Sequence, residues 1–190
     1  MLVLASASPR RRELLTQAGL RFEVYPADIA EDLLPGEEPV AYVTRLAREK
    51  AEHVYQKLAK NTPKKHLVVI GADTTVTFDG HVLGKPEDAA DAARMLRQLS
   101  GRAHRVATGI ALVSAAGTMA TAEITEVWFK PLAEEEIASY IATGEPMDKA
   151  GAYAIQGLAA RWIPRIEGCY FNVVGLPVAR LWTMLGEVSF

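Results

Sequence analysis

The sequence predicts an α/β fold in which a β-sheet is flanked by helices. Short apolar runs of strand length occur at Leu2–Ala5 and at Leu67–Ile70. A long helical pattern from about Val40 to Lys60 separates them. Strand-like runs that alternate with helical stretches are typical of α/β proteins. With 190 residues and no repeats or low-complexity linker, the chain is expected to form one domain over residues 1–190.

The first nineteen residues predict a strand, a loop and a helix. Ser8 is a good N-cap because its hydroxyl can accept a hydrogen bond from a backbone N–H that has no partner in the helix. Pro9 suits the first helical position, and Gly19 suits the left-handed residue that follows the last turn. The helix is therefore expected between these two residues.

Three arginines, Arg10, Arg11 and Arg12, occupy the first turn of this helix. A cation there is unfavourable by ~0.3–1 kcal/mol, because the N-terminus of a helix already carries partial positive charge. A bound anion would explain them, since backbone N–H groups, serine hydroxyls and guanidinium groups together suit a polyphosphate. The alternative is a basic turn that points into water.

The next helix places a lysine in an apolar stripe. Phe22–Tyr25 predicts a short strand, and the acidic loop Asp28–Asp32 follows it. On the helix from Val40 to Lys60, Lys50 lies near the centre of the apolar face. Either the lysine stem covers apolar surface and its ammonium reaches water, or the stripe faces a cleft into which Lys50 delivers a charge.

An aspartate follows the second apolar run. Leu67–Ile70 reads as a buried strand that ends in Gly71–Thr74, so Asp73 is expected at the exit of the strand. Ligands of open α/β sheets gather outside strand ends, which makes Asp73 a candidate for chemistry; the alternative is a turn or capping aspartate. Asp79-Gly80 then predicts a hairpin with a type I′ turn, whose return strand leads to Lys85.

The second half of the chain continues the alternation of helices and strands. A short strand is expected near Tyr153, and Gln156 follows it. The side-chain amide of Gln156 has a hydrogen-bond donor and an acceptor, so it can bind the edge of a nucleobase or cap a turn. The remaining elements are expected as a helix from Pro86 to Ser100, strands at Arg105–Val113 and Met119–Phe129, a helix at Ala133–Ala142, a strand near residues 163–167, a buried loop and a C-terminal helix.

Composition excludes several classes of protein. A net charge of −2 argues against a general nucleic-acid or membrane-surface binder, so neither partner is expected. The single cysteine, Cys169, excludes an internal disulfide and a multi-cysteine zinc site. No apolar run approaches the length of a membrane span, and charged residues begin too early for a signal peptide. A cytoplasmic location is therefore expected.

Five motifs are spread along the chain. They are Ser6-Ala7-Ser8-Pro9-Arg10-Arg11, Gly71-Ala72-Asp73-Thr74, Leu83-Gly84-Lys85-Pro86, Asp148-Lys149-Ala150-Gly151-Ala152-Tyr153 and Asn172-Val173-Val174-Gly175-Leu176-Pro177. Together they resemble the Maf family of nucleoside triphosphate pyrophosphatases. The resemblance implies a fold akin to the inosine triphosphate pyrophosphatases, with a mixed sheet and two lobes around a central cleft, and a homodimer. It also implies a divalent cation, Mg²⁺ or Mn²⁺, and cleavage of a nucleoside triphosphate between the α and β phosphates.

The resemblance also implies roles for individual residues. Asp73 corresponds to the catalytic acidic residue, as a proton acceptor or a metal ligand, and Glu31 to an acidic residue near the metal. The residues that correspond to those holding the triphosphate are Ser8, Arg11, Lys50 and Lys85.

Three positions resemble the branch of the family that acts on dTTP and UTP, namely Arg10, Thr74 and Gln156. The branch that takes 7-methyl-GTP has an aromatic residue in place of Arg10 and an acidic residue in place of Gln156. A methylated guanine carries positive charge and favours such groups, whereas an amide suits a neutral pyrimidine. Three alternatives remain beside hydrolysis of dTTP and UTP: a modified pyrimidine nucleotide as substrate, 7-methyl-GTP as substrate, and a nucleotide-binding regulator of cell division. The lack of a nucleophile motif disfavours an acid phosphatase.

Overall fold

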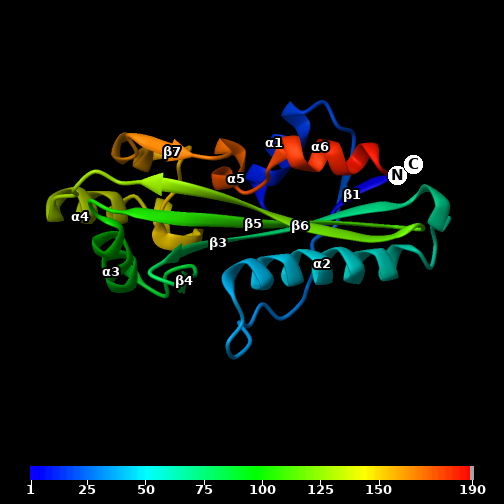
Figure 1. The fold of residues 1–190 in the computed structure, drawn as a ribbon, viewed down its shortest axis with the longest axis horizontal. Coiled ribbons are helices and arrows are strands. Elements are labelled where there is room, and N and C mark those ends of the chain that lie inside the picture. Colours follow the sequence, from blue (N-terminus) through cyan, green and yellow to red (C-terminus); the bar gives the residue numbers. More distant parts are fainter. Residues whose placement is uncertain (189–190) are drawn as a thin grey trace. The chain divides into compact units, whose positions relative to one another are not determined.

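The computed structural model describes residues 1–188, apart from the side chain of Lys64. Its described strands form one seven-stranded sheet in the order β2-β1-β3-β5-β6-β7, with β4 paired to β3 (Figure 1). Strand β1 runs parallel to β2 and β3, whereas β4 is antiparallel to β3 and β7 is antiparallel to β6. The strands are β1 (Leu2–Leu4), β2 (Glu23–Val24), β3 (Val68–Phe78), β4 (His81–Leu83), β5 (Ala103–Ser114), β6 (Gly117–Trp128) and β7 (Arg165–Glu167). The predicted α/β fold with a mixed sheet is confirmed.

Helices connect and cover the strands. The α-helices are α1 (Pro9–Gln17), α2 (Pro39–Leu58), α3 (Ala89–Leu99), α4 (Glu134–Ala142), α5 (Tyr170–Val174) and α6 (Val178–Gly186). Short 3₁₀ helices are η1 (Lys64–His66), η2 (Glu145–Asp148), η3 (Ala150–Ala152) and η4 (Leu158–Trp162). Among the described residues, no helix combines the length and apolar character that crossing a membrane requires.

The chain divides into two compact units. The first contains Met1–Thr74, Thr108–Glu123 and the described residues from Gly175 onward. The second contains Thr75–Ala107 and Ile124–Val174. Strands β3, β5 and β6 each contribute residues to both units. The cleft between two lobes that the resemblance implies stays a prediction.

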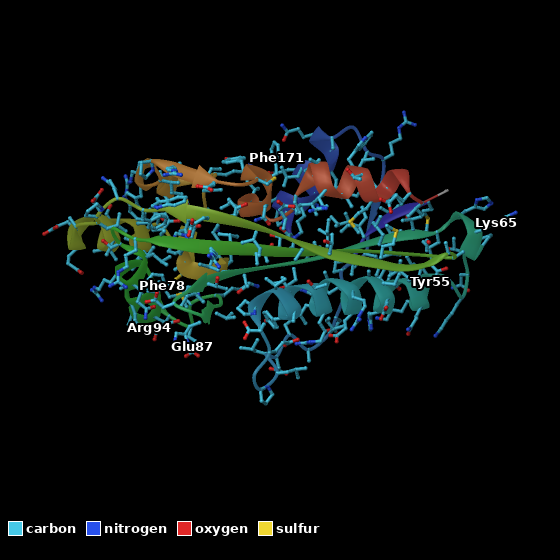
Figure 2. The ribbon with its side chains drawn as sticks, viewed as in Figure 1. Tyr55, Lys65, Phe78, Glu87, Arg94 and Phe171 are labelled. Atoms are coloured by element: carbon cyan, nitrogen blue, oxygen red, sulfur yellow. The ribbon has the colours of Figure 1, made fainter. Side chains whose placement is uncertain are left out.

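In the first unit, α2 packs on one face of the sheet, and α1 and α6 lie on the other (Figure 1). The core on the α2 side joins alternate residues of β1, β3 and β5 to the apolar stripe of the helix, as the period of two along a strand requires. Side chains fill the space between α2 and the sheet (Figure 2). The buried members of this core are Val3, Ala5, Ala47, Ala51, Val54, Leu67, Val69, Ala111 and Val113.

Two glycines let α2 lie close to the sheet. A Cβ added at Gly71 of β3 would come within 1.9 Å of the carbonyl oxygen of Ala47, and one at Gly109 of β5 within 2.1 Å of that of Val43. Glycine within a strand often marks such a close approach of another backbone. The prediction that the strand ends at Ile70 is wrong. Strand β3 runs 11 residues through Gly71, which the close approach of α2 explains, so Asp73 lies inside the strand and not at its exit.

Two local predictions from turn and cap residues are confirmed. The side chain of Ser8 caps α1, Pro9 begins the helix, and Gly19 follows it with φ of 74°. The hairpin between β3 and β4 turns at Asp79 and Gly80, which have φ of 49° and 80°. Positive φ at both central residues is the signature of a type I′ turn.

The second unit is built around aromatic rings. Helix α3 contacts α4 and η3, and the buried rings of Phe129, Tyr140, Tyr153 and Trp162 meet edge to face beside them. The short strand expected near Tyr153 is wrong, since Ala150–Ala152 forms η3. Gly151 and Ala152 have φ of 69° and 58°, which is incompatible with extended backbone.

Candidate active site

The loop between β1 and α1 is ordered by its own serines. The backbone N–H of Ser8 donates to Oγ of Ser6 at 3.2 Å, and the N–H of Arg11 donates to Oγ of Ser8 at 3.4 Å. Ser6 is buried and Ser8 is half-buried. The serines therefore set the entry into α1, whose N-terminus is suited to an anion.

Arg11 turns inward and joins three segments of the first unit. Its Nε donates to the carbonyl of Gly175 at 2.9 Å, and Nη1 donates to Ser6 Oγ at 3.1 Å and to the carbonyl of Ala72 at 2.9 Å. Its Nη2 donates to Thr74 Oγ1 at 3.0 Å. These acceptors are neutral and come from the β1–α1 loop, β3 and the segment before α6. Arg11 thus fixes these segments to one another and keeps at most one N–H on Nη2 for another acceptor.

The three arginines of the first helical turn differ in environment. Burial lowers the pKa of Arg11, and the negative charges of Asp73 and Glu31 partly oppose this effect. Arg10 is half-buried and Arg12 is exposed, and the guanidinium of Arg10 makes no hydrogen bond or ion pair with the described residues. The side chain of Arg10 is therefore available to an incoming anion, while that of Arg11 serves first as a structural tie.

Lys50 pairs with two carboxylates. Its Nζ lies 2.6 Å from Oδ1 of Asp73 and 2.7 Å from Oε1 of Glu31. Lys50 and Asp73 are each only 7% exposed, so their ion pair is largely shielded from water. The snorkelling alternative for Lys50 is wrong, because its ammonium is held at the inner face of α2 against β3. The two carboxylates and the ammonium group thus meet at one point in the first unit.

The loop that carries Glu31 is tied to α2 by two side chains. The hydroxyl of Tyr42 donates to the carbonyl of Glu31 at 2.9 Å, and Nη2 of Arg45 donates to the carbonyl of Asp32 at 2.9 Å. Burial, together with the charges of Asp73 and Glu31, raises the pKa of Tyr42, so its hydroxyl stays protonated and can donate. The loop is thereby held where Glu31 meets Lys50.

Arg45 anchors the same loop a second time. Its Nε and Nη2 donate to the two carboxylate oxygens of Glu37 at 2.7 Å each. This bidentate pair lowers the pKa of Glu37 and raises that of Arg45. The sequence pattern gave no sign of Tyr42 or Arg45, because each meets a backbone carbonyl of a loop without regular structure, whose path the sequence does not show.

Thr74 belongs to the network of Arg11. Its hydroxyl accepts from Arg11 and shares a hydrogen bond of 2.9 Å with Oγ1 of Thr108 on β5. Thr74 also lies 3.4 Å from the carbonyl oxygen of Gly175. The first unit thus contains seven of the nine predicted site residues, namely Ser8, Arg10, Arg11, Glu31, Lys50, Asp73 and Thr74. Thr108 was not expected, since only the pairing order of the sheet places it there.

The two remaining predicted residues belong to the second unit. Lys85 is exposed and directly follows Gly84, after β4, whose residue Leu83 pairs with Val76 of β3. Gln156 is exposed on a turn between η3 and η4. The participation of Lys85 and Gln156 in one site with Asp73 stays a prediction.

The carboxylates of Glu31 and Asp73 suit a cation that arrives with its own ligands. They converge on one ammonium, Nζ of Lys50, from two different segments. Among residues 1–188, no group of three or more His, Cys, Asp or Glu side chains forms a cage for a metal. Mg²⁺ commonly uses one or two carboxylates and completes its shell with water and substrate phosphates. The donor set fits such an ion.

The first unit of this α/β protein thus contains a buried lysine–aspartate pair and a helix N-terminus of the kind that suits an anion. The sequence of residues 1–188 matches the family model described as Maf-like protein. The chain belongs to the Maf family.

Named relatives are similar over nearly the whole chain. A protein of Koribacter versatilis named dTTP/UTP pyrophosphatase is 53% identical over 184 residues, which cover 97% of this chain and 92% of that protein. Proteins with the same name from Geobacter metallireducens and Syntrophomonas wolfei are 52% and 48% identical, covering 95% and 97% of this chain and 92% and 95% of their own lengths. The family membership implied by the five motifs is confirmed.

Proposed function

We propose that this chain is a nucleoside triphosphate pyrophosphatase that hydrolyses dTTP and UTP to the nucleoside monophosphate and pyrophosphate. Relatives named for this activity are about half identical to it over almost their full lengths. The structural observation that carries the proposal is the buried pair of Lys50 and Asp73 in the same unit as the start of α1. The pair supplies a proton acceptor and a cation, both of which phosphoryl chemistry needs.

The triphosphate would be held by the start of α1 and by basic side chains. The hydroxyl of Ser8 lies at the N-terminus of α1, where it caps the helix. The guanidinium of Arg10 makes no hydrogen bond to the described residues, and Arg11 keeps one N–H on Nη2 for another acceptor. We assign Lys85 to the same anion, since it is exposed next to a strand that pairs with β3. Binding of a polyanion explains why cations occupy the end of a helix that ordinarily disfavours them.

We assign Asp73 and Glu31 to hold Mg²⁺ or Mn²⁺ together with phosphate oxygens of the substrate. When bound, such an ion neutralises charge on the triphosphate and polarises the phosphorus centre. Lys50 keeps both carboxylates oriented toward one point before the substrate arrives. This preorganisation contributes to the rate because little rearrangement then remains for the reaction.

Hydrolysis would proceed by in-line attack of water on the α-phosphorus. Asp73 takes a proton from the attacking water at Oδ2, which accepts no hydrogen bond from the described residues, while Oδ1 stays paired with Lys50. A new P–O bond forms to the water oxygen, and the bond to the α–β bridging oxygen breaks. Pyrophosphate leaves, and Lys50 and Lys85 offset its negative charge.

We assign the selection of the nucleobase to Gln156, Arg10 and Thr74. The amide of Gln156 can accept from N3–H and donate to O4 of uracil or thymine, which forms a bidentate pair. Thr74 is bonded to Arg11 and Thr108, so its effect on the base passes through that network.

We further infer that the protein acts as a homodimer in the cytoplasm, where its substrates are found. Exposed apolar side chains on β6 and α5, namely Ile124, Tyr170 and Phe171, support a second copy as partner (Figure 2 labels Phe171). Ile124 and the start of α5 are neighbours, because a Cβ at Gly168 would lie 3.1 Å from the carbonyl oxygen of Ile124. Sedimentation of Phe171→Ser should show a larger monomer fraction than the unsubstituted chain, and an unchanged fraction would exclude this surface.

The activity is tested by pyrophosphate release from a panel of dTTP, UTP, CTP, the purine triphosphates and 7-methyl-GTP with Mg²⁺ or Mn²⁺. Selective release from dTTP and UTP is expected. In ¹⁸O-labelled water, the label should enter the monophosphate, because attack is on the α-phosphorus. Binding of dTTP without turnover would favour a nucleotide-binding regulator instead. A preference for 7-methyl-GTP would assign the chain to the branch of the family that acts on that nucleotide.

A further inference from the structure

The exposed Gln156 lies on a tight turn whose two ends are both fixed. The backbone N–H of Gly157 donates to the carbonyl of Ala154 at 3.0 Å, which closes the turn with Ile155 and Gln156 at its centre. The N–H of Ala154, at the start, donates to the hydroxyl of Tyr140 at 3.2 Å. The side chain that would meet the base is thus presented by a backbone segment with a defined position.

The far end of the turn is held by a carboxylate. The backbone N–H of Leu158 donates to both oxygens of Glu145, at 3.1 and 3.2 Å. The hydroxyl of Tyr140 donates to Oε1 of the same carboxylate at 2.8 Å. Tyr140 and Glu145 therefore form a bonded pair that contacts the residues on either side of Gln156. Hydrogen bonds to an ionised acceptor are stronger than those between neutral groups.

The close approach of Glu145 requires a glycine in the turn. A Cβ built at Gly157 would lie 2.0 Å from Oε1 of Glu145 and 2.5 Å from its Cδ. Any larger residue at this position would displace the carboxylate. The Gln-Gly sequence therefore combines an exposed amide with the space that its supporting carboxylate needs.

Tyr140 is itself rigidly held. It is fully buried at 0% exposure, and its ring meets that of Trp162 edge to face with centroids 4.8 Å apart. Glu145 lies at the start of η2, and its backbone carbonyl accepts from Nζ of Lys149 at 2.7 Å. A functional side chain is held in place when the residues that support it are themselves fixed by packing. The packing of Tyr140 therefore helps to fix the turn that carries Gln156.

We propose that Tyr140 and Glu145 are positioning residues for base selection, which hold the turn so that Gln156 discriminates uracil from cytosine. The inference rests on the proposed function, because that function assigns Gln156 to the base. An amide forms two hydrogen bonds to a base edge only when it approaches that edge in register, and the backbone of the turn sets where the amide starts from. Discrimination therefore depends on how firmly the turn is held.

The test is the ratio of kcat/KM for UTP to kcat/KM for CTP in four proteins: the unsubstituted chain, Tyr140→Phe, Gln156→Ala and the double variant. Measuring both substrates on one preparation cancels any loss of folded protein. Tyr140→Phe should lower the ratio about threefold to tenfold, the size expected from weakened hydrogen bonds. In the Gln156→Ala background, Tyr140→Phe should not lower it further.

Two variants complete the design. Glu145→Gln keeps an acceptor at the same place and should lower the ratio less than Tyr140→Phe, and it replaces that variant if the phenylalanine protein does not fold. Asp88→Asn is the matched control, because Asp88 also accepts from a backbone N–H, that of Asp91, and is not bonded to Tyr140, Glu145 or the turn. Its ratio should equal that of the unsubstituted chain.

The outcomes separate the inference from the proposed function. If Gln156→Ala leaves the ratio unchanged, the assignment of Gln156 to the base is wrong, and the inference fails with it. If Gln156→Ala lowers the ratio but Tyr140→Phe and Glu145→Gln do not, only the inference is overturned. Equal losses from Tyr140→Phe with and without Gln156 would also overturn it, because the effect would not pass through Gln156.

Discussion

Nζ of Lys50 on α2 lies 2.6 Å from Oδ1 of Asp73 on β3, and both residues are 7% exposed. The pair exists because Gly71, two residues before Asp73, lets α2 lie directly on the strand. Removing one member of a buried pair leaves the other charge without a partner, which destabilises a protein strongly. Stability and catalysis are therefore linked at this contact.

Replacing Lys50 with methionine tests this link. Lys50→Met should lower the free energy of unfolding by about 3 kcal/mol, because Asp73 loses its buried partner. Release of pyrophosphate from dTTP should fall on the order of a hundredfold, because the site loses a cation. Urea unfolding and a pyrophosphate assay measure the two effects. Lys57→Met on the exposed side of α2 is the control, and equal behaviour of the two variants would contradict the account.

A substitution that keeps the charge tests the structural role of Arg11. Arg11→Lys should lower the free energy of unfolding by about 2 kcal/mol, since an ammonium cannot reach the four acceptors that the planar guanidinium joins. The exposed neighbour gives the control, because Arg12→Lys should leave stability unchanged. If thermal unfolding midpoints of the two variants coincide, Arg11 does not tie these segments together.

The loop that carries Glu31 gives a prediction about metal affinity. Tyr42→Phe removes the hydrogen bond to the carbonyl of Glu31 and should raise the Mn²⁺ dissociation constant about threefold to tenfold. Electron paramagnetic resonance of free Mn²⁺ in the presence of a non-hydrolysable dTTP analogue measures it without turnover. Tyr55→Phe on the same helix is the control (Figure 2). An unchanged constant in Tyr42→Phe would show that Glu31 does not hold the ion.

Buried His104 gives a prediction for the effect of pH on stability. Burial lowers the pKa of His104 to about 3, while its Nε2 lies 2.8 Å from the hydroxyl of Tyr153. The unfolded chain binds this proton below a pKa of about 6.5 and the folded chain does not, so the contribution of His104 is fully present above pH 6.5 and is lost as the pH falls toward 3. The expected loss is about 1.4 kcal/mol per pH unit below 6.5.

The contribution of other groups is removed by comparison with a variant. The difference in free energy of unfolding between the unsubstituted chain and His104→Gln should be constant above pH 7 and should approach this slope between pH 6 and pH 5. Parallel pH curves for the two proteins would contradict a buried neutral histidine.

The sequence predicted those helix starts and turns that depend on interactions between neighbouring residues. Ser8 and Pro9 fixed the start of α1, and Asp79-Gly80 fixed the hairpin, because caps and type I′ turns depend on a few neighbouring residues. The continuation of β3 through Gly71 and Asp73 was not predictable in this way. Glycine and aspartate are disfavoured in strands, and only the packing of α2 explains them there.

The site was predictable as a set of residues but not as a set of contacts. Lys50 was notable within its apolar stripe and Asp73 after its apolar run, yet their pairing depends on the packing of α2 on β3. The inward turn of Arg11 depends on carbonyl groups of Ala72 and Gly175, which leave no trace in side-chain chemistry. Backbone acceptors are invisible to any pattern of residue types.

Hydrolysis of dTTP by Asp73→Asn tests the central claim most directly. Asparagine has nearly the same shape and keeps an oxygen for Lys50, so the variant should fold as the unsubstituted chain does. Pyrophosphate release with Mg²⁺ or Mn²⁺ should fall on the order of a hundredfold or more, because the amide cannot accept the proton of the attacking water. Release at the rate of the unsubstituted chain would contradict the account.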